Sequence, residues 1–278
     1  MSIVARHVVL SPFKCYPFVQ KISTYARLSF MKAIILSAGQ GTRLLPYTED
    51  KPKCLLEIMG RPILGWQLEV LLSQDIRQIT VVTGFGHEKV EGYIRKTYAS
   101  SGVKALYNPE YATSDNLVSC WHSAPEMDGD FILLNGDTLF EPAVLKRLLA
   151  EAEGDINLTI SIKDQYDADD MKVIFEGKRL RRVGKDLPLS QVNGESIGLS
   201  LYRDRGPELF KEALKEAISS PESRGRWYLS VIDALARQGL VNVVSIAGLS
   251  WCEIDFPKDL DSAMPVVHTI SQELDLKP

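Results

Sequence analysis

Short apolar runs alternate with amphipathic stretches through the first half of the chain. The runs are rich in Ile, Val and Leu and end near Gly, Asn or Asp, which is typical of buried strands in a parallel sheet. They lie at residues 32–37, 79–83, 103–107 and 131–134. Between them, apolar positions recur at helical spacing and predict helices over about 62–74, 87–98, 115–124 and 141–151. This alternation predicts βαβ units.

The second half has more closely spaced strands. The runs 172–175 and 179–183 flank the turn Glu176-Gly177-Lys178, which is typical of a β-hairpin. Tyr228 lies on the apolar face of a predicted helix, so we expect it to pack in the core. Further strands are predicted at 156–162, 195–202 and 241–246, and helices at about 206–218, 226–238 and from Phe256-Pro257 onward.

The two halves together predict an α/β fold with a Rossmann-like, doubly wound, mostly parallel but mixed sheet. The strand-rich second half predicts an inserted β-rich lobe. We expect residues 31–278 to form one domain, with its halves at about 31–150 and 151–265. In such sheets ligands bind beyond the carboxyl ends of the strands, which here are Ser37, Thr83 and Asn135.

Residues 1–30 differ from the rest of the chain. They contain Arg6, Lys14, Lys21 and Arg27 but no acidic residue. The apolar run Val8-Val9-Leu10 is too short for the core of a signal peptide. Two interpretations stay open, a targeting peptide and an upstream extension from a misassigned start, with Met31 as the natural first residue. We expect the segment to be poorly ordered.

Composition narrows the class of protein. A net charge of −4 gives no general basic field for nucleic acid, so any phosphate must bind at a local site. No apolar run approaches the ~20 residues of a membrane span. The four cysteines form no CxxC pair, and scattered thiols favour a cytoplasmic location. The number of subunits stays open, a homo-oligomer included.

The most specific motif follows the first strand. It runs from Leu36 through Ser37-Ala38-Gly39-Gln40-Gly41-Thr42 to Arg43-Leu44, and Lys51-Pro52-Lys53 comes next. Gly39 and Gly41 allow the backbone to approach a phosphate group, and Arg43 and Lys53 add positive charge for a triphosphate. The motif lacks the GxxxxGK[ST] of a Walker loop, and Leu44 replaces the third glycine of the dinucleotide fingerprint.

This stretch resembles the sugar-phosphate and alcohol-phosphate nucleotidyltransferases, whose hallmark is LAAGxGTRL followed by a PK dipeptide. Ser37 departs mildly from that pattern. The resemblance covers nearly the whole chain from Met31. It implies that Gly39, Gly41 and Thr42 wrap the β- and γ-phosphates of an NTP and that Arg43 and Lys53 neutralise them. Leu36 and Ala38 lie in the same nucleotide-binding segment.

Separated carboxylates form a second signal. Asp137 follows a strand in Asn135-Gly136-Asp137, and alternation places Glu253 and Asp255 on one side of an extended segment. Magnesium prefers carboxylate, phosphate and water oxygens. The resemblance implies that Asp137 and Asp255 bind Mg²⁺ and that Glu253 contacts the metal or the acceptor. The alternatives are a turn cap for Asp137 and a helix N-cap for Asp255.

Residues of the second half are candidates for the acceptor site. The resemblance implies that Lys185, after the hairpin, contacts the acceptor phosphate and that Glu195 lines the acceptor pocket. The alternative for Lys185 is a solvated surface lysine. Trp227 is a candidate for cation–π contact with a quaternary ammonium. In the first half, Asn116 and Ser119 resemble residues beside the base and ribose, and Asp115 is a candidate helix cap.

These residues predict transfer of a nucleotide from an NTP to a small phosphorylated substrate, with release of pyrophosphate. A phosphomonoester is mostly dianionic at neutral pH, its second pKa being about 6, so the reaction needs no general base. The resemblance is strongest to bacterial CTP:phosphocholine cytidylyltransferases and so favours CTP. Inositol-1-phosphate, 2-aminoethylphosphonate or a sugar phosphate stay open as acceptors. A catalytically inactive regulatory subunit and a dinucleotide-binding oxidoreductase are the rivals from other classes.

Overall fold

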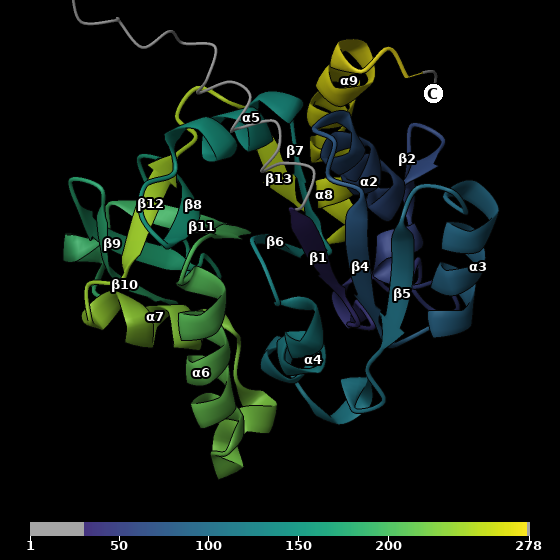
Figure 1. Ribbon diagram of the computed structural model, residues 1–278. Helices are drawn as coiled ribbons and strands as arrows, with labels where there is room; N and C mark the ends of the chain where they lie inside the picture. Colours follow the sequence, from purple (N-terminus) through teal and green to yellow (C-terminus); the bar gives the residue numbers. More distant parts are fainter. Residues whose placement is uncertain (1–30, 277–278) are drawn as a thin grey trace, which may run out of the picture.

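The computed structural model describes residues 31–276 and is organised around one nine-stranded sheet (Figure 1). The expectations for residues 1–30 lie outside the described residues. The strand order is β5-β4-β1-β6-β11-β8-β12-β10-β9. Among the described helices, none combines the length and hydrophobicity that a bilayer crossing requires.

The first half forms the parallel part of the sheet, as the sequence predicts. Strands β1 (Lys32–Ser37), β4 (Gln78–Thr83), β5 (Val103–Tyr107) and β6 (Phe131–Asn135) pair in parallel. The connecting helices are α2 (Ile63–Ser73), α3 (His87–Thr97), α4 (Asn116–His122) and α5 (Pro142–Glu151). A two-stranded hairpin of β2 (Glu57–Ile58) and β3 (Arg61–Pro62) precedes α2.

The second half continues the same sheet, so a separate inserted lobe is not confirmed. Its strands are β8 (Ile156–Ser161), β9 (Lys172–Glu176), β10 (Arg179–Gly184), β11 (Gly194–Tyr202) and β12 (Val241–Ser245). Strand β11 pairs antiparallel with both β6 and β8. Because it lies inside the sheet between these two strands, it is buried over its whole length. The predicted hairpin of β9 and β10 lies at the sheet edge.

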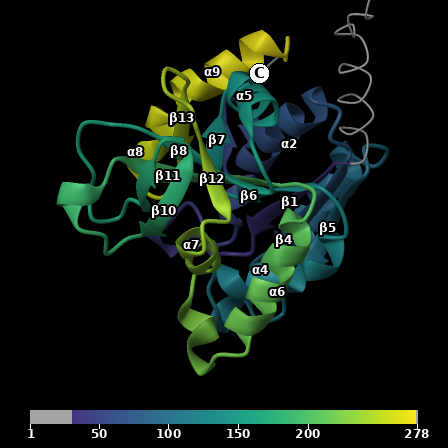
Figure 2. The same ribbon diagram turned by 60° about the vertical axis from the view of Figure 1, so that its left-hand side comes forward.

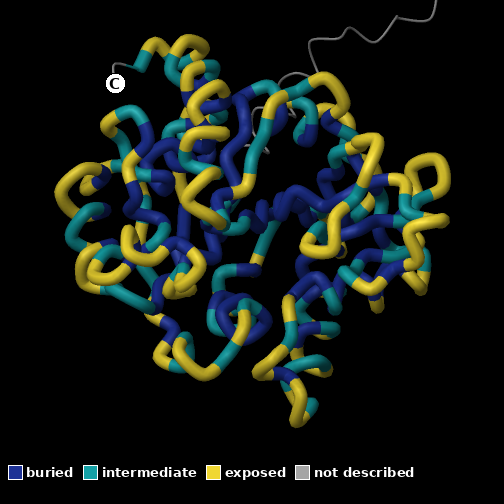
Figure 3. The backbone as a smooth tube through the Cα atoms, turned by 180° about the vertical axis from the view of Figure 1, so that it is seen from behind, coloured by how far each residue is buried: buried dark blue, intermediate teal, exposed yellow. Residues whose placement is uncertain are grey.

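Helices cover both faces of the sheet. Alternate residues of β1 point into different cores: Ala33 and Ile35 pack in one, and Ile34 and Leu36 pack in the other. The first core lies under α2, α3, α5 and the C-terminal helix α9 (Met264–Glu273), and the second under α4, α6 (Gly206–Ile218) and α7 (Leu229–Arg237). Figures 1 and 2 show α9 beside α2 and α5, and Figure 3 shows the buried segments toward the middle of the molecule and the exposed ones at its periphery.

A small second sheet was not predicted. Strand β7 (Thr138–Phe140) pairs antiparallel with β13 (Trp251–Glu253), which places Glu253 opposite Thr138. Helix α8 (Pro257–Ser262) follows. Strands of three residues are too short to show a period, and their pairing depends on residues more than 100 positions apart in the sequence.

A glycine in β11 controls how closely the two halves approach. Gly198 has φ of +71°, and a Cβ atom there would lie 2.5 Å from the side-chain nitrogen of Asn135, at the end of β6. The register of β11 against β8 also shifts between Ser196 and Ser200. Gly198 therefore permits both the bend of β11 and its contact with the end of β6.

We predict that Gly198→Ala lowers the free energy of unfolding by about 1–3 kcal/mol, because the alanine combines a positive φ with a clash against Asn135. Gly184→Ala is the matched control in β10, since its Cβ would have no neighbour within 4 Å and its φ is not positive. Denaturant unfolding of the two variants measures the difference. Equal stabilities would contradict the role given to Gly198.

Candidate active site

Lys53 lies between two carboxylates at the carboxyl edge of the sheet. Its Nζ donates to Oδ2 of Asp137 at 2.8 Å and to Oδ1 of Asp255 at 2.7 Å. The lysine side chain is only 14% exposed. Burial opposes its charge, but the attraction of Asp137 and Asp255 outweighs burial and raises the pKa of Lys53. The sequence-predicted cation and the predicted metal ligands therefore meet at one point.

Asp137, Glu253 and Asp255, which we call the acidic cluster, each offer a carboxylate oxygen within 4.8 Å of the other two. The β7–β13 pairing brings these residues together, since Ile254 N also donates to the Asp137 carbonyl at 3.0 Å. The Glu253 residue is exposed as a whole, but the protein around its carboxyl group partly excludes water. This desolvation and the repulsion from Asp137 and Asp255 raise the pKa of Glu253 to about 8.

The alternatives for the two aspartates do not hold in the structure. The amides of Asp255 and Phe256 donate to the Asp259 carboxylate at 2.9 and 2.7 Å, so Asp259 satisfies the start of α8. The Asp255 carboxylate instead contacts Lys53 and, at 3.3 Å, Arg43. Asp137 uses Oδ2 for Lys53, while its Oδ1 is buried without a hydrogen-bond partner. Neither carboxylate caps a helix or turn.

The glycine-rich segment forms a turn beside Lys53. Gly41 has φ of +70°, and a Cβ there would lie 2.9 Å from the Lys53 Cβ, so glycine is required for the close approach. Gly39 has no neighbour within 4 Å of the Cβ position and is exposed, as is Thr42. The exposed backbone at these positions is available to an anion.

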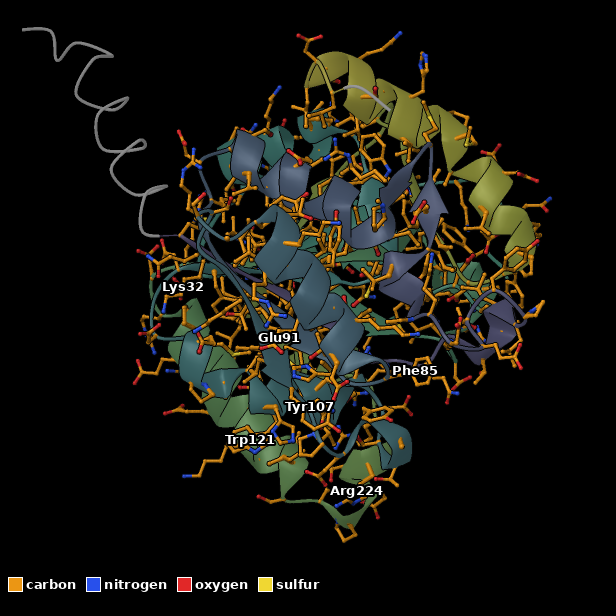
Figure 4. All side chains as sticks on the ribbon, turned by 90° about the vertical axis from the view of Figure 1, so that its right-hand side faces the viewer. Lys32, Phe85, Glu91, Tyr107, Trp121 and Arg224 are labelled. Carbon is orange, nitrogen blue, oxygen red and sulfur yellow. The ribbon has the colours of Figure 1, made fainter. Side chains whose placement is uncertain are left out.

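The remaining positions of this segment have supporting roles. Leu36 and Ala38 are buried, and the Ala38 carbonyl accepts from the amide of Phe85 at 3.1 Å. Phe85 follows β4, and Figure 4 labels it among the side chains on that side of the molecule. The Arg43 guanidinium lies 5.5 Å from the Phe256 ring centroid. The segment is therefore anchored to β4 and to the start of α8.

Lys185 and Trp227 line a cavity of about 200 Å³, which the acidic cluster also lines. The Lys185 Nζ lies 4.6 Å from the centroid of the Trp227 ring, and 3.9 Å from a carboxylate oxygen of Asp169. The cavity is lined by Arg43, Asn116, Asn135, Asp137, Asp169, Met171, Lys185, Ser196, Gly198, Trp227, Leu229, Glu253 and Asp255. The cavity therefore brings Arg43 and Lys185 together with the acidic cluster.

The start of α4 holds the segment between α6 and α7, which contains Trp227. The amides of Asp115 and Leu117 donate to the carbonyls of Arg224 and Arg226, and the Asn116 side chain accepts from the Tyr228 amide at 2.9 Å. Figure 4 labels Arg224 near the end of this region. Asn116 is therefore both a cavity residue and a structural anchor. The Asp115 side chain makes no capping hydrogen bond, although Asp115 is the N-cap residue of α4.

Three other predictions have mixed outcomes. Glu195, near the start of β11, is 5% exposed and is not among the cavity-lining residues. Its carboxylate pairs with Lys163 at 2.7 Å. Ser119 is buried and accepts from Asn108 at 3.0 Å. Tyr228 is fully buried, as expected.

Sequence reasoning missed several cavity residues. Asn135, Ser196 and Gly198 come from the ends and bend of β6 and β11, and Asp169 and Met171 come from the β8–β9 connection. Asn135 is the one with a usable signal, since it ends a buried strand directly before Gly136-Asp137. The others depend on tertiary pairing.

Comparison with known proteins identifies the family. The MobA-like NTP transferase domain matches residues 33–203, well over half of the chain. The chain belongs to this family. The match confirms the nucleotidyltransferase resemblance of the sequence and covers both the glycine-rich segment and Asp137.

Two curated relatives and one solved structure agree with this family. A CMP-5'-(3-aminopropyl)phosphonate synthase of Streptomyces rubellomurinus is 30% identical over 239 residues, 82% of this chain and 37% of that protein. A choline-phosphate cytidylyltransferase of Streptococcus pneumoniae is 34% identical over 111 residues, 40% of this chain and 47% of that protein. The chain therefore spans less than half the length of either relative.

The solved structure is the inositol-1-phosphate CTP transferase from T. maritima. It superposes with a TM-score of 0.74 at 23% identity and covers 87% of this chain and 96% of that one. This likeness establishes the Rossmann-like α/β fold.

We predict that Lys53→Met lowers the metal-free stability by roughly 1–3 kcal/mol, because Asp137 and Asp255 lose their charged donor. The same variant should gain more thermal stability from Mg²⁺ or Mn²⁺ than the wild type, since the acidic cluster no longer holds an ammonium group. Thermal melts with and without each ion measure both effects.

Lys51→Met is the matched control, because that half-buried lysine pairs with Glu57 at 3.6 Å and not with the acidic cluster. A cation response of Lys53→Met no larger than that of Lys51→Met would argue against metal binding at the acidic cluster.

Proposed function

We propose that this protein is a metal-dependent cytidylyltransferase, which transfers CMP from CTP to a small, amine-bearing alkyl phosphate or phosphonate and releases pyrophosphate. The observation that carries the proposal is the acidic cluster, which Arg43 and Lys53 contact directly and which lines the same cavity as Lys185. Joining two phosphate-bearing substrates requires charge neutralisation on both sides of the reacting phosphorus.

The triphosphate would bind along the glycine-rich segment. Gly39, Gly41 and Thr42 would bring backbone close to it, with Leu36 and Ala38 as the buried support. Arg43 and Lys53 would neutralise the phosphates that leave as pyrophosphate. Asn116 and Ser119 would lie toward the base and ribose, although both already have partners within the protein.

The chemistry of the acidic cluster fits a divalent cation such as Mg²⁺. Its three carboxylates are hard oxygen donors within reach of one ion, and the buried Oδ1 of Asp137 has no hydrogen-bond partner. Asp137 and Asp255 would hold the ion, with Glu253 beside them. A bound Mg²⁺ supplies positive charge where the two phosphate groups approach each other.

The reaction is an in-line displacement at the α-phosphorus. An oxygen of the acceptor phosphate forms the new bond, the bond from the α-phosphorus to the bridging oxygen of pyrophosphate breaks, and the electron pair leaves with pyrophosphate. The acceptor reacts as its dianion, so no residue has to remove a proton. Lys185 would hold that dianion in line, while Arg43 and Lys53 would stabilise the leaving group.

The surroundings of Lys185 favour an acceptor that carries its own cation. In the structure the Lys185 ammonium lies against the Trp227 ring and near Asp169, which together make a site for a positive charge. When Lys185 turns to an acceptor phosphate, the substrate ammonium would take this place, with Glu253 nearby. The names of two relatives, a CMP-5'-(3-aminopropyl)phosphonate synthase and a choline-phosphate cytidylyltransferase, each contain a group that combines a cationic nitrogen with a phosphate or phosphonate.

2-Aminoethylphosphonate belongs to the proposed class, whereas inositol-1-phosphate and a sugar phosphate stay as alternative acceptors, and the T. maritima neighbour is an inositol-1-phosphate CTP transferase. An inactive regulatory subunit is disfavoured because the loop cations and the acidic cluster are all retained. The oxidoreductase alternative is not supported by the family match.

We expect pyrophosphate release with CTP and Mg²⁺ in the presence of phosphocholine, 3-aminopropylphosphonate or 2-aminoethylphosphonate, and little with inositol-1-phosphate or glucose-1-phosphate. A coupled pyrophosphate assay over four NTPs and these acceptors tests this. Asp137→Asn should reduce the rate at least about 100-fold, whereas Asp261→Asn, on the exposed side of α8, should not. Faster reaction with inositol-1-phosphate or glucose-1-phosphate, which lack an ammonium group, would overturn the proposed acceptor class.

Two variants separate the two substrates. Lys185→Ala should raise the acceptor KM by roughly 10–100-fold and leave the CTP Kd unchanged, because one charged hydrogen bond is lost. Gly39→Ala should keep its stability, since its Cβ meets nothing within 4 Å, but weaken CTP binding where the triphosphate approaches the backbone. Calorimetry and steady-state kinetics measure both. Weaker CTP binding in Lys185→Ala would move Lys185 into the nucleotide site.

A further inference from the structure

Lys172, at the start of β9, is a buried lysine without a carboxylate partner among the described residues. It is 3% exposed, yet its ammonium group donates to backbone carbonyls: Ala168 at 3.1 Å, Asp170 at 3.5 Å and Lys185 at 3.0 Å. A buried charge is costly unless such hydrogen bonds compensate it. An apolar residue could fill this position in the sheet without the free-energy cost of burying a charge. Packing alone therefore does not explain a lysine here.

The three carbonyls belong to two segments that meet at the cavity. Ala168 and Asp170 lie in the connection between β8 and β9, which also supplies Asp169 and Met171 to the cavity wall. Lys185 follows β10 and supplies the cation that faces Trp227. Lys172 therefore links the backbone on both sides of Asp169 to the backbone of Lys185.

A second set of contacts ties the β8–β9 connection to β11. Lys163 pairs with Asp170 at 2.8 Å and with Glu195 at 2.7 Å. Glu195 is almost fully buried and lies directly opposite Lys172 in the β11–β9 pairing. Burial raises the pKa of Glu195, and the Lys163 ammonium opposes that rise.

We call Lys172 together with the Lys163–Glu195 ion pair the Lys172 network. Lys172 and Glu195 are buried and Lys163 is exposed, and none of the three is a cavity-lining residue. They act on the cavity through residues that do line it, namely Asp169, Met171 and Lys185.

We propose that the Lys172 network is a positioning device for acceptor binding, in which Lys172 sets the backbone of Lys185 and of the Asp169 segment so that both reach the acceptor. This inference rests on the proposed function, in which Lys185 binds the acceptor phosphate. A displacement of about 1 Å at a group that aligns a reactant lowers turnover by up to about 100-fold, so small backbone shifts at Lys185 are consequential.

The test compares Lys172→Met with Lys178→Met in the full chain. Lys178 lies in the turn of the same β9–β10 hairpin and is exposed, with Glu153 as its ion-pair partner. Steady-state pyrophosphate release gives KM for phosphocholine or 3-aminopropylphosphonate, and calorimetry gives the Kd of CTP. We expect Lys172→Met to raise the acceptor KM about tenfold or more and to leave the CTP Kd within about twofold. Lys178→Met should change neither.

A double-mutant cycle separates positioning from general support of the fold. If Lys172 acts through Lys185, then Lys172→Met should add little to the acceptor KM of Lys185→Ala. Fully additive effects, or equal losses in acceptor and CTP binding, would overturn the proposal. Lys172→Arg keeps the charge and several donors and should restore part of the acceptor affinity.

Glu195→Gln provides a second route if Lys172→Met does not accumulate as folded protein. It weakens the hold on Lys163 while Lys172 stays in place, and it should also raise the acceptor KM without changing the CTP Kd. An unchanged acceptor KM in folded Glu195→Gln would then overturn the proposal. A wild-type chain that releases no pyrophosphate with any acceptor would overturn the proposed function itself. An active wild type with unaltered variants would overturn only the positioning role.

Discussion

The ion pairs of Lys53 with Asp137 and Asp255 join three parts of the chain that are remote in sequence. The lysine follows the glycine-rich segment of β1, Asp137 follows β6, and Asp255 follows β13. The carboxylate oxygens of the two aspartates and Glu253 lie within 4.8 Å of one another. Without a cation between them, these charges would repel one another. The positions of the glycine-rich segment, of β7 and of β13 are therefore mutually dependent. This one contact both stabilises the carboxyl edge of the sheet and defines where the reaction would occur.

Strand β11 supplies the second constraint, because it connects the parallel half of the sheet to the rest. It bends at Gly198, where the backbone approaches Asn135 too closely for any side chain. The first part of β11 pairs with β9 and holds Glu195 opposite Lys172, and its last part pairs with β6. The same strand thus borders both the proposed acceptor side and the proposed nucleotide side. Their relative placement is a consequence of sheet pairing rather than of a hinge between two lobes.

Local patterns predicted what depends on local forces. The parallel strands, their helices and the β9–β10 hairpin can be recognised in the sequence from the spacing of apolar residues and from the turn residues between them. Asp255 was ambiguous between helix cap and site residue, because only the folded chain shows that Asp259 satisfies the start of α8. The ion pair of Glu195 could not be predicted for the same reason: its partner Lys163 is 32 residues away, in the connection after β8. Lys172 carries no sequence signal at all, since a lysine at a strand start is ordinarily exposed.

Lys53 and Lys185, the two lysines proposed to bind phosphate, are held with very different strength, and under the proposed function this difference would order the binding of substrates. Lys185 contacts an aromatic face and a carboxylate 3.9 Å away, both of which a dianionic phosphate can readily outcompete. Lys53 has two charged hydrogen bonds of 2.7 and 2.8 Å in a largely buried place. It can turn fully toward a triphosphate only when another cation replaces it between Asp137 and Asp255. A nucleotide that arrives together with a divalent cation meets this condition, whereas a metal-free nucleotide must compete with both aspartates.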